Sequence, residues 1–227
     1  DHMPVIEPDR AVLITESYKM TEGEPIISRR SKAFAHILKN IPITIRDNEL
    51  IVGSATKVPR GCQVFPEFSF EWLESEFDTI EKRSADPFYI SDETKKTLHE
   101  VYKYWKGKTT SDLATSFMAH ETITAIEHNM FTPGNYFYNG VGHVTVDYAK
   151  ILKYGFSGII ERAKEELSKL SFEQPEYITK TQFLNAVIES CTAAALYAKR
   201  YSALALELAD KCTDAKRKNE LLLISYN

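Results

Sequence analysis

The end of the chain, from Glu176 to Asn227, contains neither glycine nor proline. A segment of this length without either helix breaker, and with apolar residues at helical spacing, is expected to be α-helical. Its apolar face is marked by Phe183, Val187, Cys191, Ala194, Ala195, Ala198, Tyr201, Ala205 and Leu208. Thr213 and Asp214 predict the N-cap of a last helix, apolar from Leu221 to Ile224. Because that pattern shows no C-cap signal, we expect the chain to be part of a longer polypeptide.

Proline and capping residues predict further helices earlier in the chain. Pro8 and Pro25 occupy positions typical of a first helical residue, which predicts one helix ending near Gly23 and another ending before Pro42. Later helices are predicted from Ser91 to Trp105, from Thr110 or Ser111 to about Met118, from Thr122 to His128, and from Asp147 to Leu170 with weak points at Gly155 and Gly158.

Short β-branched segments interrupt the helical pattern. Ile41–Ile45 and Leu50–Gly53 are predicted to be strands or extended segments, separated by the turn formers Asp47 and Asn48, and Gly61–Phe68 is predicted to be extended. The predicted fold class is therefore mainly α with a few short strands. Such an architecture by itself selects no function.

Composition excludes several classes of protein. With 43% hydrophobic residues, 26% charged residues and a net charge of −4, the chain is typical of a globular protein and has no basic patch for nucleic acid. No apolar run approaches the roughly 20 residues that a membrane span needs. The start, Asp1–Pro4, lacks the basic and apolar regions of a signal peptide, which favours the cytoplasm.

Cysteine and histidine spacing indicates no metal site. Cys62, Cys191 and Cys212 are odd in number and far apart, so neither a disulfide framework nor a zinc or iron–sulfur site is expected. His120 and His128 are eight positions apart on a predicted helix, too far to share one ion without other ligands.

One segment differs from the rest of the chain. Residues 131–144 combine glycines, asparagines, a histidine and three consecutive aromatic residues. Asn135 and His143 can each donate and accept a hydrogen bond without bringing a charge, as a ligand with hydroxyl groups requires. Two interpretations stay open on chemistry alone: a structural role in turns and core, or contact with a small hydroxylated molecule.

Common catalytic motifs are absent from the sequence. Gly140-Val141-Gly142 begins like a dinucleotide-binding motif, but Thr145 occupies the third glycine position. Neither a serine-hydrolase elbow nor a phosphate-binding loop occurs. The chain therefore carries no complete catalytic set of these kinds.

The whole chain, residues 1–227, resembles the N-terminal region of the glycyl radical enzymes, the pyruvate formate-lyase-like family. Within that family it is most similar to the B12-independent glycerol and propane-1,2-diol dehydratases. The matching segments are Asp9–Glu16, Glu49–Gly53, Gln63–Ser69, Tyr104–Thr110 and Gly134–Val144. The resemblance implies that residues 1–227 form a single N-terminal region of the family's α/β barrel fold.

The resemblance also implies a mechanism. A glycyl radical generates a thiyl radical on a cysteine, which abstracts hydrogen from C1 of the diol, and the C2 hydroxyl then leaves as water to give an aldehyde. Asn135 and His143 match the family's contacts to the substrate hydroxyls. The radical glycine, the thiyl cysteine and the acid/base carboxylate have no match here, so no catalytic residue is assigned to this chain. Among the carboxylates of this chain, Glu67 and Asp147 are singled out for comparison with the structure. Packing or capping roles are expected for both.

Cofactor, partners and location follow from the same resemblance. The radical would be installed by a radical S-adenosylmethionine activating enzyme, and the substrate would be a small diol. A homodimer is expected, with no bound metal, no nucleic acid and no membrane, in the cytoplasm or in a bacterial microcompartment. Two alternatives remain: another glycyl radical lyase, such as choline trimethylamine-lyase, and a non-catalytic helical interaction module.

Overall fold

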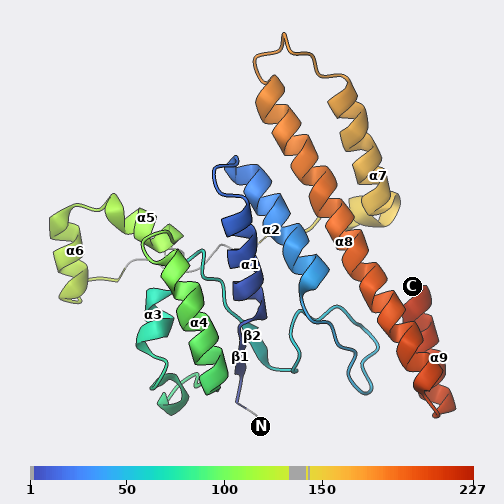
Figure 1. Cartoon of the computed structure of the whole chain (residues 1–227), viewed down its shortest axis with the longest axis horizontal. Helices are drawn as coiled ribbons and strands as arrows, with labels where there is room; N and C mark the ends of the chain where they lie inside the picture. The colour runs from blue at the N-terminus through green and yellow to red at the C-terminus, as the bar shows by residue number, and fades with distance from the viewer. Residues whose placement is uncertain (1–2, 133–141, 143) are drawn as a thin grey trace. The chain divides into compact units, whose positions relative to one another are not determined.

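The computed structural model describes residues 3–132, 142 and 144–227 (Figure 1). The described elements are β1 (Val5–Glu7), α1 (Asp9–Met20), α2 (Ile26–Asn40), β2 (Gly61–Gln63), α3 (Glu71–Ser75), the 3₁₀ helix Ile80–Lys82, α4 (Asp92–Trp105), α5 (Thr110–Ser116), α6 (His120–Glu127), α7 (Tyr148–Ser168), α8 (Tyr177–Lys211) and α9 (Ala215–Tyr226). The prediction of a mainly helical fold with a few short strands is confirmed.

The chain divides into two compact units. Unit 1 comprises Asp1–Thr15 and Arg60–Val146, and unit 2 comprises Glu16–Pro59 and Asp147–Asn227. The boundary falls inside α1, so that one helix belongs to both. That residues 1–227 form one region of a longer enzyme stays a prediction.

Unit 1 is built on α1, α4 and the only two strands among the described residues. β1 and β2 pair in parallel, with Ile6 opposite Cys62. The core of unit 1 contains Phe70, whose ring stacks on Tyr102 of α4 at a centroid distance of 5.3 Å. The indole N–H of buried Trp105 donates to Thr15 Oγ1 at 2.8 Å. This buried hydrogen bond ties the end of α4 to α1.

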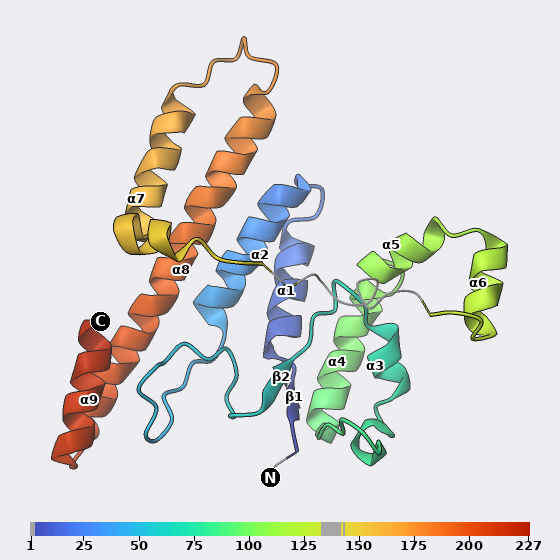
Figure 2. The ribbon, with the colours of Figure 1, turned by 180° about the vertical axis from the view of Figure 1, so that it is seen from behind.

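Unit 2 is a helical bundle organised around α8, which packs against α2, α7 and α9 (Figure 2). The residues of α8 that are buried are mostly alanines, which let neighbouring helices approach closely: Ala186, Ala193, Tyr201, Ala205 and Ala209. The sequence pattern predicts Tyr201 and Ala205 on this face correctly. Phe183, also predicted there, is 54% exposed.

Helix α7 confirms one predicted weak point. Gly155 adopts φ 62° and ψ 179°, which interrupts the helix at a conformation that other residues rarely adopt. Apart from the adjacent residues and the nearby backbone of the same helix, no atom lies within 4 Å of the position that a Cβ on Gly155 would occupy. This glycine therefore serves the backbone conformation rather than close packing.

Two predictions from local pattern are narrowed by the structure. Ile41–Ile45 and Leu50–Gly53, predicted to be strands or extended segments, form no strand, and side chains of α8 and α9 donate to the backbone carbonyls of Ile41, Arg46 and Glu49 in this region. The N-cap of α5 is Thr109 rather than Thr110 or Ser111.

A helix that crosses a bilayer needs about 20 predominantly apolar residues. None of the helices that the structure describes is long and apolar enough to cross a membrane.

Candidate functional site

The two predicted substrate contacts, Asn135 and His143, lie outside the described residues, so their role stays a prediction. Both belong to residues 131–144, the predicted substrate segment. In the sequence this segment follows α6 and precedes α7. Next to His143, the Val144 N–H donates to the Gly142 carbonyl at 3.0 Å. What the structure does define is how the helices on either side of the segment are held.

Helix α6 ends in a Schellman motif directly before the segment. The Asn129 N–H donates to the Ile126 carbonyl, and the Met130 N–H donates to the Ala125 carbonyl, each at 2.9 Å. Asn129 adopts the left-handed conformation, with φ 54°, which asparagine tolerates better than most residues. The chain therefore leaves the helix at a defined point before the predicted substrate segment.

Helix α7 begins at Asp147, one of the two carboxylates singled out in the sequence. Asp147 Oδ1 accepts the Lys150 N–H at 3.0 Å, which is an N-cap hydrogen bond. The predicted capping role is confirmed. The carboxylate stabilises the helix that follows the glycine-rich segment.

Glu67, the other carboxylate, forms a bidentate ion pair with Arg10 of α1. Arg10 Nη1 lies 3.1 Å from Oε2, and Nη2 lies 2.5 Å from Oε1. The two side chains are only 13% and 12% exposed. The guanidinium also lies 3.7 Å from the centroid of the Phe65 ring and donates to the Val64 carbonyl. The expected packing role of Glu67 is confirmed.

The backbone of the same segment holds the start of α5. The Glu67 carbonyl accepts the Thr110 N–H, and the Phe68 carbonyl accepts the Ser111 N–H, both at 2.9 Å. Thr109 and Asp112 form a capping box, with each side chain accepting the backbone N–H of the other residue. The side chain and the backbone of Glu67 thus join segments that are far apart in sequence. From the start of α5, the chain continues through α6 to the segment that contains Asn135.

A cavity of about 430 Å³ lies in unit 1 next to this junction. Among its lining residues are Phe70, Tyr102, Lys106, Thr109 and Asp112. Burial, aided by nearby carboxylates, raises the pKa of Tyr102, so its phenol stays protonated at neutral pH. Asp112 is occupied by the capping box. These groups therefore fit a structural role better than a role in acid–base catalysis.

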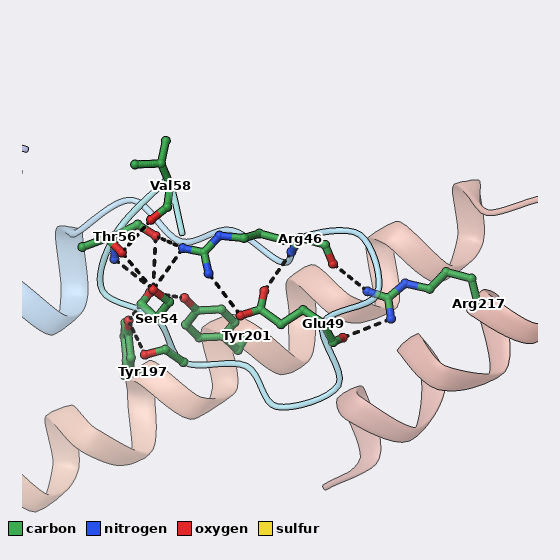
Figure 3. Close-up of polar contacts among 9 residues, drawn as sticks. Arg46, Glu49, Ser54, Thr56, Val58, Tyr197, Tyr201 and Arg217 are labelled. Carbon is green, nitrogen blue, oxygen red and sulfur yellow. Dashed lines mark hydrogen bonds and ion pairs between the residues drawn. The ribbon is translucent and has the colours of Figure 1, made fainter. Parts of the chain in front are cut away.

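In unit 2, a polar network fixes the loop between α2 and unit 1 (Figure 3). Arg46 Nη2 donates to Ser54 Oγ at 3.1 Å and to the Thr56 carbonyl at 2.8 Å, and its backbone N–H donates to Glu49 Oε2 at 2.8 Å. One side chain therefore joins both ends of the loop.

Two helices complete this network. Arg217 of α9 donates to the carbonyls of Arg46 and Glu49, at 2.9 and 3.0 Å (Figure 3). The hydroxyl of Tyr201 in α8 donates to the Ser54 carbonyl at 2.6 Å. Within the loop that these contacts hold, Ile51 is 91% exposed. The Glu49–Gly53 segment is thus positioned by α8 and α9.

The cysteines show no sign of nucleophilic activation. No disulfide is formed by Cys62, Cys191 or Cys212. Cys62 is exposed and Cys191 is half-buried, and partial desolvation by surrounding atoms raises the pKa of both thiols, which disfavours the reactive thiolate. Within the described ranges, no group of His, Cys, Asp and Glu residues could hold a metal ion.

Sequence patterns did not identify Arg10 and Arg217 as organising residues. An arginine that donates to distant carbonyls has no periodic signature. The available signal for Arg10 was its place in a segment that matches the glycyl radical enzymes.

Comparisons with known proteins agree with that match. The family model described as pyruvate formate lyase-like matches residues 1–227. A structure from Roseburia inulinivorans that addresses 1,2-propanediol dehydration is 59% identical, with a TM-score of 0.95, over 99% of this chain and 27% of that one. The glycerol-bound B12-independent glycerol dehydratase from Clostridium butyricum is 57% identical, with a TM-score of 0.94, over 99% of this chain and 28% of that one.

A more distant relative is named for a charged diol. The (2S)-3-sulfopropanediol dehydratase of Klebsiella oxytoca is 36% identical over 98% of this chain. The chain spans 28% of the length of that relative. Most of each of these relatives therefore lies outside the region compared.

Proposed function

The chain belongs to the pyruvate formate lyase-like family of glycyl radical enzymes, and we propose that the enzyme containing it eliminates water from glycerol or propane-1,2-diol. The observation that carries this proposal is the difference in identity between relatives. Two structures concerned with glycerol and 1,2-propanediol are 57% and 59% identical to this chain, whereas the sulfopropanediol dehydratase is 36% identical.

The charge of the predicted substrate segment favours a neutral diol. Between Lys108 and Lys150 the sequence contains neither lysine nor arginine. A sulfonate placed against this segment would find no fixed cation within it, and an unpaired anion is costly to remove from water. A neutral diol needs only hydrogen-bond donors and acceptors, which Asn135 and His143 offer.

In this proposal the chain supplies binding and orientation. The amide of Asn135 and the imidazole of His143 hold the two hydroxyl groups, so that one C–H bond and one hydroxyl present a single geometry to the reacting groups. A glycyl radical and a cysteine outside residues 1–227 supply the hydrogen abstraction. The radical would be installed by a radical S-adenosylmethionine activating enzyme.

The test is a substrate panel with the complete enzyme, activated anaerobically. Glycerol, propane-1,2-diol, (2S)-3-sulfopropanediol and choline are compared by kcat/KM. We expect one of the two neutral diols to exceed the sulfonate and choline by about a hundredfold or more, the effect of roughly 3 kcal/mol. A higher kcat/KM with the sulfonate or choline would assign another lyase activity, and absence of both radical and turnover would favour an interaction module.

A further inference from the structure

Helices α5 and α6 contain no buried residue, in contrast to α4 immediately before them. We define the α5–α6 segment as residues 110–131. Four large apolar side chains of this segment are exposed: Leu113 at 60%, Phe117 at 83%, Met130 at 78% and Phe131 at 49%. Four large exposed apolar side chains within one segment of this length are typical of a surface that another polypeptide covers.

The charged residues of the segment also favour a surface that another polypeptide covers. Its acidic residues are Asp112, Glu121 and Glu127, and it contains no lysine or arginine. Asp112 is already engaged in the capping box with Thr109. A helix pair built to face water normally carries charges of both signs on its outer surface.

The structure shows where this segment is attached and where it ends. The start of α5 is held by the carbonyls of Glu67 and Phe68 and by the capping box, and Arg10 holds Glu67 in turn. The end of α6 is closed by the Schellman motif at Asn129. The apolar side chains are therefore presented by two defined helices.

We propose that the α5–α6 segment is the face on which the rest of the enzyme, outside residues 1–227, docks. The choice of this occupant has two grounds. The matched relatives carry most of their length outside the compared region, since the chain covers only 27% and 28% of the two diol-related structures. The segment also leads directly into the stretch that holds Asn135. This second ground rests on the proposed function, in which the reacting groups lie outside this chain.

Phe172 provides a matched control for Phe117. Both are phenylalanines with nearly equal exposure, 86% and 83%. Phe172, however, lies between α7 and α8 in a segment with charges of both signs, Lys169, Glu173 and Glu176, and its ring contacts Tyr177 at a centroid distance of 4.3 Å. The docking proposal requires Phe117 to be covered and makes no such demand of Phe172.

The experiment compares Phe117→Cys and Phe172→Cys in the complete enzyme. Labelling of each new thiol by a maleimide is followed by peptide mass spectrometry, which separates it from the three native cysteines of this region. We expect Phe117→Cys to react at least roughly a hundredfold more slowly than Phe172→Cys, as for a site that must open locally before it reacts. The protection should be unchanged over a hundredfold dilution of the enzyme.

Equal labelling rates would overturn the proposal. Protection that disappears on dilution would assign the face to a second copy of the enzyme and would overturn it as well. Hydrogen exchange of residues 110–131 in the unmodified complete enzyme gives the same test if the Phe117→Cys variant fails to fold. None of these readouts needs substrate or radical, so they can fail or succeed independently of the diol dehydratase activity.

Discussion

Arg10 and Glu67, 57 positions apart in the sequence, form a nearly buried bidentate ion pair that joins α1 to the segment anchoring α5. Both carboxylate oxygens are used, and the guanidinium lies over the Phe65 ring. An ion pair with two parallel hydrogen bonds fixes orientation as well as distance. The pair therefore orients Glu67, whose backbone carbonyl holds the start of α5, the helix that leads through α6 to the predicted substrate segment.

Replacing Glu67 with glutamine should loosen this junction. The neutral amide would leave the Arg10 charge unpaired in a nearly buried position, and we expect a loss of about 1–3 kcal/mol of local stability. The measurement is hydrogen exchange of residues 64–68 and 109–112 in the complete enzyme. Glu100→Gln is the control, because the Lys103–Glu100 pair is exposed and should contribute about 0–1 kcal/mol. Equal effects of the two substitutions would contradict the role given to Arg10.

Arg217 should be needed for the loop of residues 46–58. Arg217→Met removes the charged donor from the carbonyls of Arg46 and Glu49, which we expect to cost about 1–3 kcal/mol. Hydrogen exchange within the loop should then be about tenfold to a hundredfold faster. Lys218→Met, at the adjacent exposed position of α9, should leave the exchange rates unchanged. Unchanged exchange in Arg217→Met would show that Arg46 and Tyr201 hold the loop without it.

The Cys62 thiol should react slowly at neutral pH even though the residue is exposed. Partial desolvation raises the pKa of the thiol, so its thiolate fraction at pH 7 is smaller than that of a free cysteine and increases as the pH rises toward the raised pKa. Alkylation by iodoacetamide should therefore be slower than that of a cysteine peptide at pH 7. At high pH, where both thiols are ionised, the ratio of the two rates should depend only on how accessible each thiol is to the reagent. Faster alkylation of Cys62 at pH 7 would indicate an activated thiol.

Local signals explain which elements could be predicted from the sequence. Ser91 caps α4 through the Thr94 N–H, and Gly107 follows its end with φ 72°, as the sequence indicates. Partners that are distant in sequence leave no such signal. The pairing of Arg10 with Glu67 and the irregular backbone of the loop around Glu49 both depend on contacts that form only in the folded chain.

The buried face of α8 was only partly predictable, for a related reason. Its sequence is apolar on more than one side, so periodicity cannot decide which side meets α2, α7 and α9. Small residues such as Ala186 and Ala193 are buried, while Phe183 is half exposed. For Asn135 and His143, the sequence supplies the chemistry and the resemblance supplies the role, and both residues lie outside the described part of the structure.

The account depends most on His143 holding a hydroxyl group of the substrate. The direct measurement is kcat/KM of the activated complete enzyme carrying His143→Ala, with glycerol and with propane-1,2-diol. Loss of a hydrogen bond to a buried hydroxyl should cost at least about 1 kcal/mol, so we expect a decrease of roughly fivefold or more with the preferred diol. A kcat/KM within about twofold of the unmodified enzyme, for both diols, would contradict the assignment.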